Sequence, residues 1–116
     1  MKAELDHITS ASNPSVKRLR SLERKKGRNE TGLFLAEGAR LIEQALAQSW
    51  SVDTLVVSNS GIERDYVQDL AERAAAQGAR LIQVPDRLAG SEAGRASRDS
   101  SFCLMAAITD LSLIHI

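Results

Sequence analysis

The 116-residue sequence predicts one α/β domain, a three-layer α/β/α sandwich around a mostly parallel, four-stranded sheet. Three observations lead to this prediction. Short apolar runs alternate with amphipathic segments of helical period, which is typical of strands connected by helices. The run at residues 52–58 is almost continuously apolar, as expected of a strand that is covered on both faces. The length is sufficient for one such core but not for two.

The N-terminal third is expected to contain a basic helix and a strand. Asn13 suits an N-cap because its side-chain oxygen can accept from a free backbone N–H, and Pro14 suits the first helical turn. Gly27 is predicted to end this helix. A polar turn over residues 28–32 then leads to a short buried strand at residues 33–36.

Helices and strands alternate through the rest of the chain. The helices are predicted at residues 39–48 and 63–77, and the strands at residues 52–58, 80–84 and 102–108. Residues 86–101 begin with a candidate short helix but are otherwise polar and glycine-rich, so we expect a loop there whose role is open.

The chain is neutral overall, but its charge is unevenly distributed. Residues 1–40 carry a net charge of +4 and residues 41–116 a net charge of −4. Residues 13–28 contain seven Lys or Arg against one acid, Glu23. Such a segment indicates local contact with a polyanion, with an ordinary solvated helix face as the alternative.

The basic side chains of this segment would bind phosphate as point charges or planar forks, contacts that position a nucleic acid without reading its sequence. The candidates are Lys17, Arg18, Arg24, Lys25, Lys26 and Arg28. RNA is favoured over DNA because no recognition-helix architecture is evident. Aromatic residues make up only 3%, which argues against a stacking platform for single strands.

A Glu-Gly-Ala-Arg turn follows the strand at residues 33–36. Glu37 is either a catalytic carboxylate or, as we favour, a structural residue that accepts from the next helix or pairs with an arginine, because a carboxylate is stabilised at a helix N-terminus. Gly38 permits a tight turn or the close approach of a ligand backbone. Arg40 is expected either to face RNA phosphate or to pair with Glu37 or Glu43.

Several classes of protein are not indicated. There is no Gly-x-Gly-x-x-Gly and no phosphate-binding loop ending in Gly-Lys-Ser/Thr, and two His with one Cys do not suggest a zinc site. No apolar run approaches the ~20 residues of a membrane span, and the N-terminus lacks the apolar core of a secretory signal. We therefore expect a cytoplasmic protein without membrane association.

Two motifs in this order and spacing resemble a known family. They are Asn13-Pro14-x-Val16-Lys17 and Phe34-Leu35-x-Glu37-Gly38-x-Arg40, with Ile8-Thr9-Ser10 before them and Leu22, Arg28 and Gly32 between them. Over residues 7–108 the chain resembles the N-terminal substrate-binding domain of SpoU (TrmH-like) RNA 2′-O-ribose methyltransferases. The resemblance implies the fold of ribosomal proteins that bind kinked RNA, and docking of ribosomal or transfer RNA.

The resemblance also implies where the reaction takes place. Catalysis in the family belongs to a following domain, which holds S-adenosylmethionine in a knotted site and forms the main homodimer interface. No catalytic, cofactor-binding or metal-binding residues are therefore expected in this chain. The residues expected to contact or support RNA are Asn13, Lys17, Arg18, Arg24, Arg28, Glu37, Gly38 and Arg40. One departure from the family is at residues 96–101, where a Thr/Pro-Gln-Gly type of segment is common.

The expected organisation is an extended lead-in at residues 1–12, an RNA substrate-binding domain at 13–108 and a truncated end at 109–116. Residues 111–116 read LSLIHI, which is the translation of a transposon-end adapter used in library preparation. They are either adapter-derived, so that the chain is an inactive N-terminal fragment, or an ordinary apolar tail. The alternative functions are a free-standing RNA-binding protein of the kink-binding type and a small interaction domain.

Overall fold

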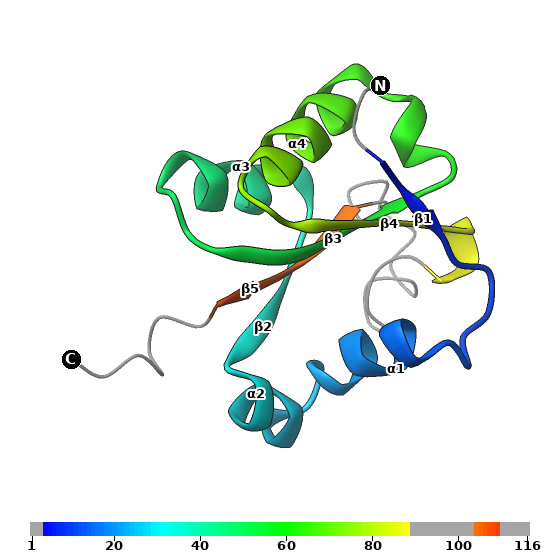
Figure 1. Cartoon of the computed structure of the whole chain (residues 1–116), viewed down its shortest axis with the longest axis vertical. Helices are drawn as coiled ribbons and strands as arrows, with labels where there is room; N and C mark the ends of the chain where they lie inside the picture. Colours follow the sequence, from blue (N-terminus) through cyan, green and yellow to red (C-terminus); the bar gives the residue numbers. More distant parts are fainter. Residues whose placement is uncertain (1–3, 89–103, 110–116) are drawn as a thin grey trace.

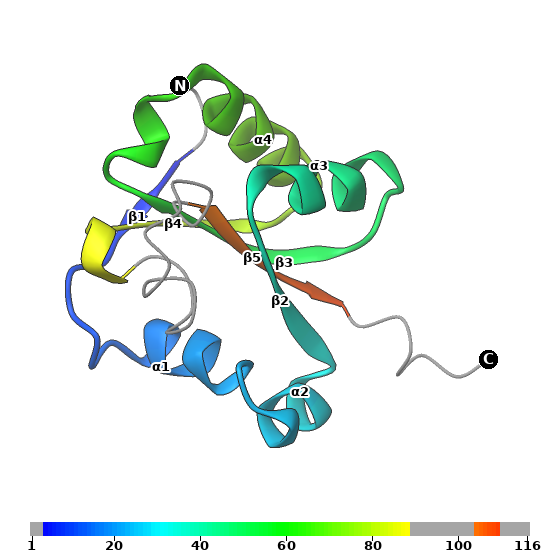
Figure 2. The same cartoon turned by 180° about the vertical axis from the view of Figure 1, so that it is seen from behind.

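The computed structural model describes residues 4–88 and 104–109, and its helices lie on both faces of a central sheet. Helices α1 (Pro14–Ser21) and α2 (Lys25–Thr31) cover one face, and α3 (Ala39–Ala47) and α4 (Asp65–Ala76) cover the other, as Figure 1 and, from behind, Figure 2 show. The predicted α/β class is confirmed.

The sheet differs from the prediction in strand number and direction. Its strands are β1 (Asp6–His7), β2 (Leu33–Glu37), β3 (Val52–Ser58), β4 (Arg80–Val84) and β5 (Leu104–Thr109), in the spatial order β1-β4-β3-β5-β2. β4 is parallel to β1 and β3, whereas β5 is antiparallel to β3 and β2. The mostly parallel four-stranded sheet is therefore corrected to a mixed five-stranded one. A two-residue strand leaves no periodicity to detect, and an apolar run specifies burial but not strand direction.

Two apolar clusters hold the three layers together. Leu55 and Val57 of β3 pack with Ile42 of α3 in the cluster under α3 and α4. Val56, between them in sequence, packs with Leu19 of α1 in the cluster under α1. Successive side chains of a strand point to opposite faces, so a strand buried on both sides must be continuously apolar. The expectation for this strand is confirmed.

The basic segment forms two short helices instead of the single helix predicted. Gly27 does not end a helix but lies buried inside α2. A Cβ atom at Gly27 would stand 2.1 Å from the carbonyl oxygen of Ser21, so α2 packs with its backbone directly against the end of α1. Of the residues predicted as a polar turn, 28–31 belong to α2, and Gly32 caps the helix in the left-handed conformation (φ 73°).

The remaining boundaries agree with the sequence to within a few residues. Two short 3-10 turns, η1 (Gly61–Glu63) and η2 (Asp86–Leu88), precede α4 and follow β4. Most of the predicted loop at 86–101 and the tail at 111–116 lie outside the described residues. Within the described ranges, no helix has the length and apolar character that crossing a membrane requires.

Candidate nucleic-acid interface

Asn13 positions the start of the basic helix. Its Oδ1 accepts a hydrogen bond from the backbone N–H of Ser15 at 2.8 Å, and Pro14 occupies the first helical position. The predicted N-cap is confirmed. The amide NH₂ group has no part in the cap and could donate to a phosphate, and a contact between Asn13 and RNA stays a prediction.

A basic groove lies between α1, the segment before it and η2. Its volume is about 730 Å³, and its lining includes the cations Lys17, Arg20, Arg24 and Arg87 against one carboxylate, Glu23. An excess of cations on a concave surface attracts a polyanion and retains it by displacing its counterions. This groove is the strongest candidate site for a nucleic-acid backbone in the part of the chain that the structure describes.

Two arginines of the groove are anchored by backbone carbonyls. Arg20 donates from Nη2 to the carbonyl of Leu88 at 2.7 Å, and Arg87 donates from Nη2 to the carbonyl of Thr9 at 2.8 Å. Arg20 also lies 3.7 Å from the carboxylate of Glu23. These contacts set the orientation of both guanidinium groups at the groove before any ligand binds, which lowers the entropy cost of binding.

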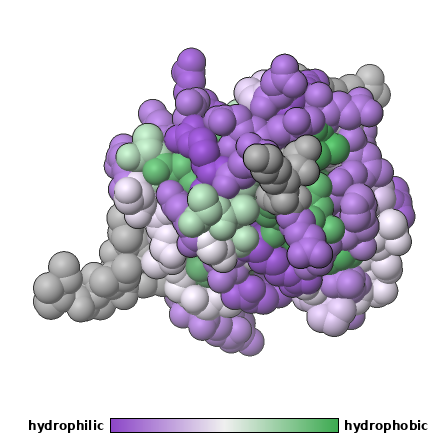
Figure 3. Space-filling model, turned by 45° about the horizontal axis from the view of Figure 1, so that its top comes forward, coloured by the Kyte–Doolittle hydropathy of each residue, from purple (hydrophilic) through white to green (hydrophobic). Residues whose placement is uncertain are grey.

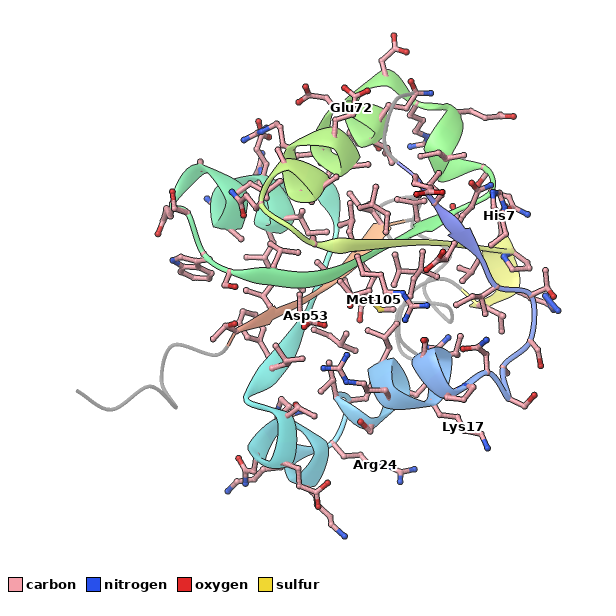
Figure 4. The ribbon with its side chains drawn as sticks, viewed as in Figure 1. His7, Lys17, Arg24, Asp53, Glu72 and Met105 are labelled. Atoms are coloured by element: carbon pink, nitrogen blue, oxygen red, sulfur yellow. The ribbon has the colours of Figure 1, made fainter. Side chains whose placement is uncertain are left out.

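Lys17 and Arg24 supply mobile charge at the rim of the same groove. Both are exposed, and their side chains project away from the body of the protein from α1 and from the α1–α2 connection, as Figure 4 shows. Among the described residues, neither forms a hydrogen bond or an ion pair through its side chain. These two cations are therefore available to a ligand without breaking an internal contact.

Arg18 and Arg28, both predicted to contact phosphate, have partners inside the protein. Arg18 Nη1 lies 3.2 Å from Oδ2 of Asp53 on β3, which attaches α1 to the sheet. Arg28 donates from Nη1 to the carbonyl of Leu22 at 3.2 Å and thereby connects α2 to the end of α1. Neither residue lines the groove. Their contribution to RNA binding stays a prediction, and in the structure they connect α1 with β3 and α2 with the end of α1.

The Glu37 turn forms a second, separate pocket. Glu37 ends β2, Gly38 precedes α3 with φ 94°, and Arg40 is exposed in the first turn of α3. The pocket has a volume of about 370 Å³ and shares no lining residue with the groove. The structure thus separates the predicted site residues into two groups. The tight strand-to-helix turn expected of Gly38 is present, and its N–H donates to the carbonyl of Leu104 at 3.0 Å.

Among the described residues, Glu37 and Arg40 do not form the pairings that the sequence predicted. Oε2 of Glu37 is buried and has no hydrogen-bond partner among the described residues, so it neither caps α3 nor pairs with an arginine through this atom. Glu43, the other expected partner of Arg40, lies 3.9 Å from Arg73 of α4. Successive side chains of β2 point to alternate faces of the sheet, and the position of Glu37 in the strand directs its side chain away from α3.

Arg20 and Arg87 are the site residues that the sequence did not single out. Arg20 was one basic residue among several in its helix. Arg87 lies far along the chain from the basic segment, and no sequence pattern around it indicates a binding residue. It reaches the groove because β1 and β4 are parallel neighbours, so the segments that follow these strands leave the sheet at the same edge. These two segments carry Thr9 and Arg87, which are joined by a hydrogen bond.

The opposite layer has the opposite charge. On η1 and α4 the acids Glu63, Asp65, Asp69 and Glu72 outnumber Arg64 and Arg73. The surface on this side is mostly hydrophilic (Figure 3). A polyanion is therefore attracted to the α1 side and repelled from the α4 side. Within the described ranges, no group of three or more His, Cys, Asp or Glu side chains is arranged to hold a metal ion.

Comparison with known proteins identifies relatives of this fold. An rRNA methyltransferase from Sinorhizobium meliloti superposes with a TM-score of 0.72 at 29% identity, covering 91% of this chain and 37% of that protein. An RNA 2′-O ribose methyltransferase superposes with a TM-score of 0.69 at 26% identity, covering 95% of this chain and 40% of that protein.

One curated sequence is also similar. It is an uncharacterized tRNA/rRNA methyltransferase from Synechocystis sp., 48% identical over 48 residues, which are 41% of this chain and 18% of that protein. The chain thus spans less than half the length of each of these relatives. The resemblance to the substrate-binding domains of SpoU-type methyltransferases is confirmed. Residues 13–99 match the model of the MRM3-like substrate binding domain, and the chain belongs to that family.

Proposed function

We propose that this chain is the RNA substrate-binding part of an S-adenosylmethionine-dependent ribose 2′-O-methyltransferase that acts on ribosomal or transfer RNA. The observation that carries the proposal is the basic groove, in which two anchored arginines and two exposed cations surround one cavity. Similar structures include an S-adenosylmethionine-bound rRNA methyltransferase and an RNA 2′-O ribose methyltransferase, which support the reaction and the cofactor.

The role of this chain in the reaction is to hold the RNA. Lys17 and Arg24 would attract the phosphates, and Arg20 and Arg87 would fix them through donors that are already oriented. Such contacts position a strand without reading its sequence. Once the backbone is held here, the target ribose is presented to the catalytic part at a high effective concentration, which is how a binding module accelerates a tethered reaction.

The groove does not suit the cofactor itself. S-adenosylmethionine carries a sulfonium cation, and a cavity lined by four cations and one carboxylate would repel that charge. We place the cofactor, which supplies the methyl group, in the part of the relatives' length that this chain does not span. The same part would form the homodimer, and the whole protein would work in the cytoplasm.

A titration with ribosomal RNA fragments at two salt concentrations tests the proposal. Contacts with about three phosphates predict that affinity falls steeply, with a slope of about 0.9 per phosphate in a plot of log affinity against log salt. The absence of binding at low salt would refute the proposal. Methyl transfer is measured in the full-length protein, where weaker binding should reduce activity at low RNA concentration.

Variants locate the binding face. We expect the double variant Lys17→Ala, Arg24→Ala to weaken binding and to lower the salt slope by about 2, one unit for each phosphate that is no longer bound. The control is Arg64→Ala, Arg73→Ala, which removes the same charge from the α4 side. If both double variants weaken binding equally, the groove is not the site and only net charge matters.

A further inference from the structure

We propose that Glu23 makes the basic groove selective for RNA over DNA by accepting a hydrogen bond from a ribose 2′-hydroxyl. This inference rests on the proposed function and deepens it, because phosphates are common to both nucleic acids and the 2′-hydroxyl distinguishes them. Among the described residues that line the groove, Glu23 is the one carboxylate, and it lies beside Lys17, Arg20, Arg24 and Arg87.

A carboxylate is unfavourable in a groove that binds only phosphate. Like charges repel, so Glu23 opposes the attraction that the four cations exert on a polyanion. The guanidinium of Arg20 is also held by the carbonyl of Leu88 at 2.7 Å, so its orientation does not depend on Glu23 alone. Glu23 becomes favourable for binding only if the ligand also carries a hydrogen-bond donor.

Glu23 is the strongest hydrogen-bond acceptor among the described side chains of the groove. Lysine and arginine side chains have donors only. The hydroxyl of Ser21, the other side-chain oxygen there, donates to the carbonyl of Arg18 at 2.5 Å. A carboxylate accepts several hydrogen bonds at once, so Glu23 can keep its ion pair with Arg20 while a ligand donates to it. The side chain of Glu23 is 23% exposed and can therefore be reached from the groove.

The spacing of Arg20 and Glu23 suits one nucleotide of RNA. Nη1 of Arg20 lies 3.7 Å from Oε2 of Glu23, so a cation and an acceptor line the groove side by side. In RNA, the 2′-hydroxyl and the 3′-phosphate are attached to neighbouring carbons of the ribose. A phosphate that is held by Arg20 therefore brings the 2′-hydroxyl of the same nucleotide close to Glu23. Deoxyribose has no hydroxyl at this position and leaves the carboxylate near a phosphate without a donor.

The experiment compares a hairpin of ribosomal RNA with hairpins of the same sequence in 2′-fluoro RNA and in DNA. Fluorine at the 2′ position keeps the A-form geometry and the phosphates but cannot donate a hydrogen bond. Binding to the wild-type chain is measured by fluorescence anisotropy at low salt. We expect RNA to bind about 10-fold more tightly than 2′-fluoro RNA, the low end for a hydrogen bond to a charged group, because Glu23 is partly exposed. DNA should bind no more tightly than 2′-fluoro RNA.

Variants assign the preference to Glu23. Glu23→Ala removes the acceptor together with its negative charge, so it should bind the RNA and 2′-fluoro hairpins equally and the 2′-fluoro hairpin more tightly than the wild type does. The control is Glu30→Ala. It removes a carboxylate that is paired with Lys26 at 3.9 Å but does not line the groove, and it should keep the preference for RNA.

Three results would overturn the inference while the proposed function stands. They are equal binding of the RNA and 2′-fluoro hairpins to the wild type, binding of DNA as tight as that of RNA, and a Glu23→Ala variant that retains the preference. In the last case Glu23 would only orient Arg20, because both hairpins would then be weakened by the same factor. Absence of binding to every hairpin at low salt would refute the proposed function, and this inference with it.

Discussion

Replacing Gly27 by alanine tests how α1 and α2 are joined. An ordinary glycine inside a helix is unfavourable, and its replacement by alanine stabilises the protein by about 1 kcal/mol. The structure predicts the opposite sign. The new Cβ would stand 2.1 Å from the carbonyl oxygen of Ser21 and 2.6 Å from its carbonyl carbon, and these are backbone atoms that cannot rotate away.

The magnitude follows from the cost of overpacking, typically about 1–3 kcal/mol. Because the obstacle is backbone, we expect Gly27→Ala to lower the free energy of unfolding by about 3 kcal/mol, a large part of the roughly 5–15 kcal/mol of a typical domain. Urea unfolding followed by circular dichroism measures it. The same displacement of α2 should weaken RNA binding, because Arg24 lies in the connection that would have to move.

Gly32→Ala is the matched control. Gly32 directly follows α2, but nothing lies within 4 Å of its position for a Cβ atom, and its φ is 73°. Gly32→Ala should lower the free energy of unfolding by only about 1–2 kcal/mol, the cost of holding an alanine in the left-handed conformation. A Gly27→Ala variant that is as stable as the wild type, or more stable, would show that α1 and α2 do not pack in the way described.

Three further substitutions test other contacts. Asn13→Ala should lower the free energy of unfolding by about 0.5–2 kcal/mol because the cap is removed, whereas Asn13→Asp, measured in the same urea titration, should not. Ile42→Ala removes a side chain that is 0% exposed and should cost about 2–5 kcal/mol, which thermal unfolding would report. Arg18→Ala breaks an exposed ion pair with Asp53 and should lower the free energy of unfolding by less than about 1 kcal/mol. If Arg18→Ala weakens RNA binding and Asp53→Asn does not, Arg18 belongs to the RNA interface.

The parts of the fold that the sequence predicted correctly depend on short-range interactions. The cap at Asn13 involves residues two positions apart, and the strand at Val52–Ser58 is recognisable from its nearly continuous apolar run. Helices α3 and α4 carry their apolar side chains at helical spacing. The motifs around Asn13 and Glu37 also sufficed to identify the family, because they depend on the order of residues along the chain.

Other features depend on residues that meet only after folding. The antiparallel direction of β5 and the pairing of β1 with β4 are contacts between distant segments, and no local periodicity encodes them. The requirement for glycine at position 27 comes from the end of another helix and not from a turn.

The candidate site shows the same division. The sequence by itself determined that positive charge gathers in residues 13–28 and that a Glu-Gly-Ala-Arg turn follows the next strand. Only the tertiary structure brought Arg87 beside that charge and separated the groove from the Glu37 pocket. The physical reason is that charge and turn chemistry belong to neighbouring residues, whereas a groove is formed by the surfaces of elements that the sheet places side by side.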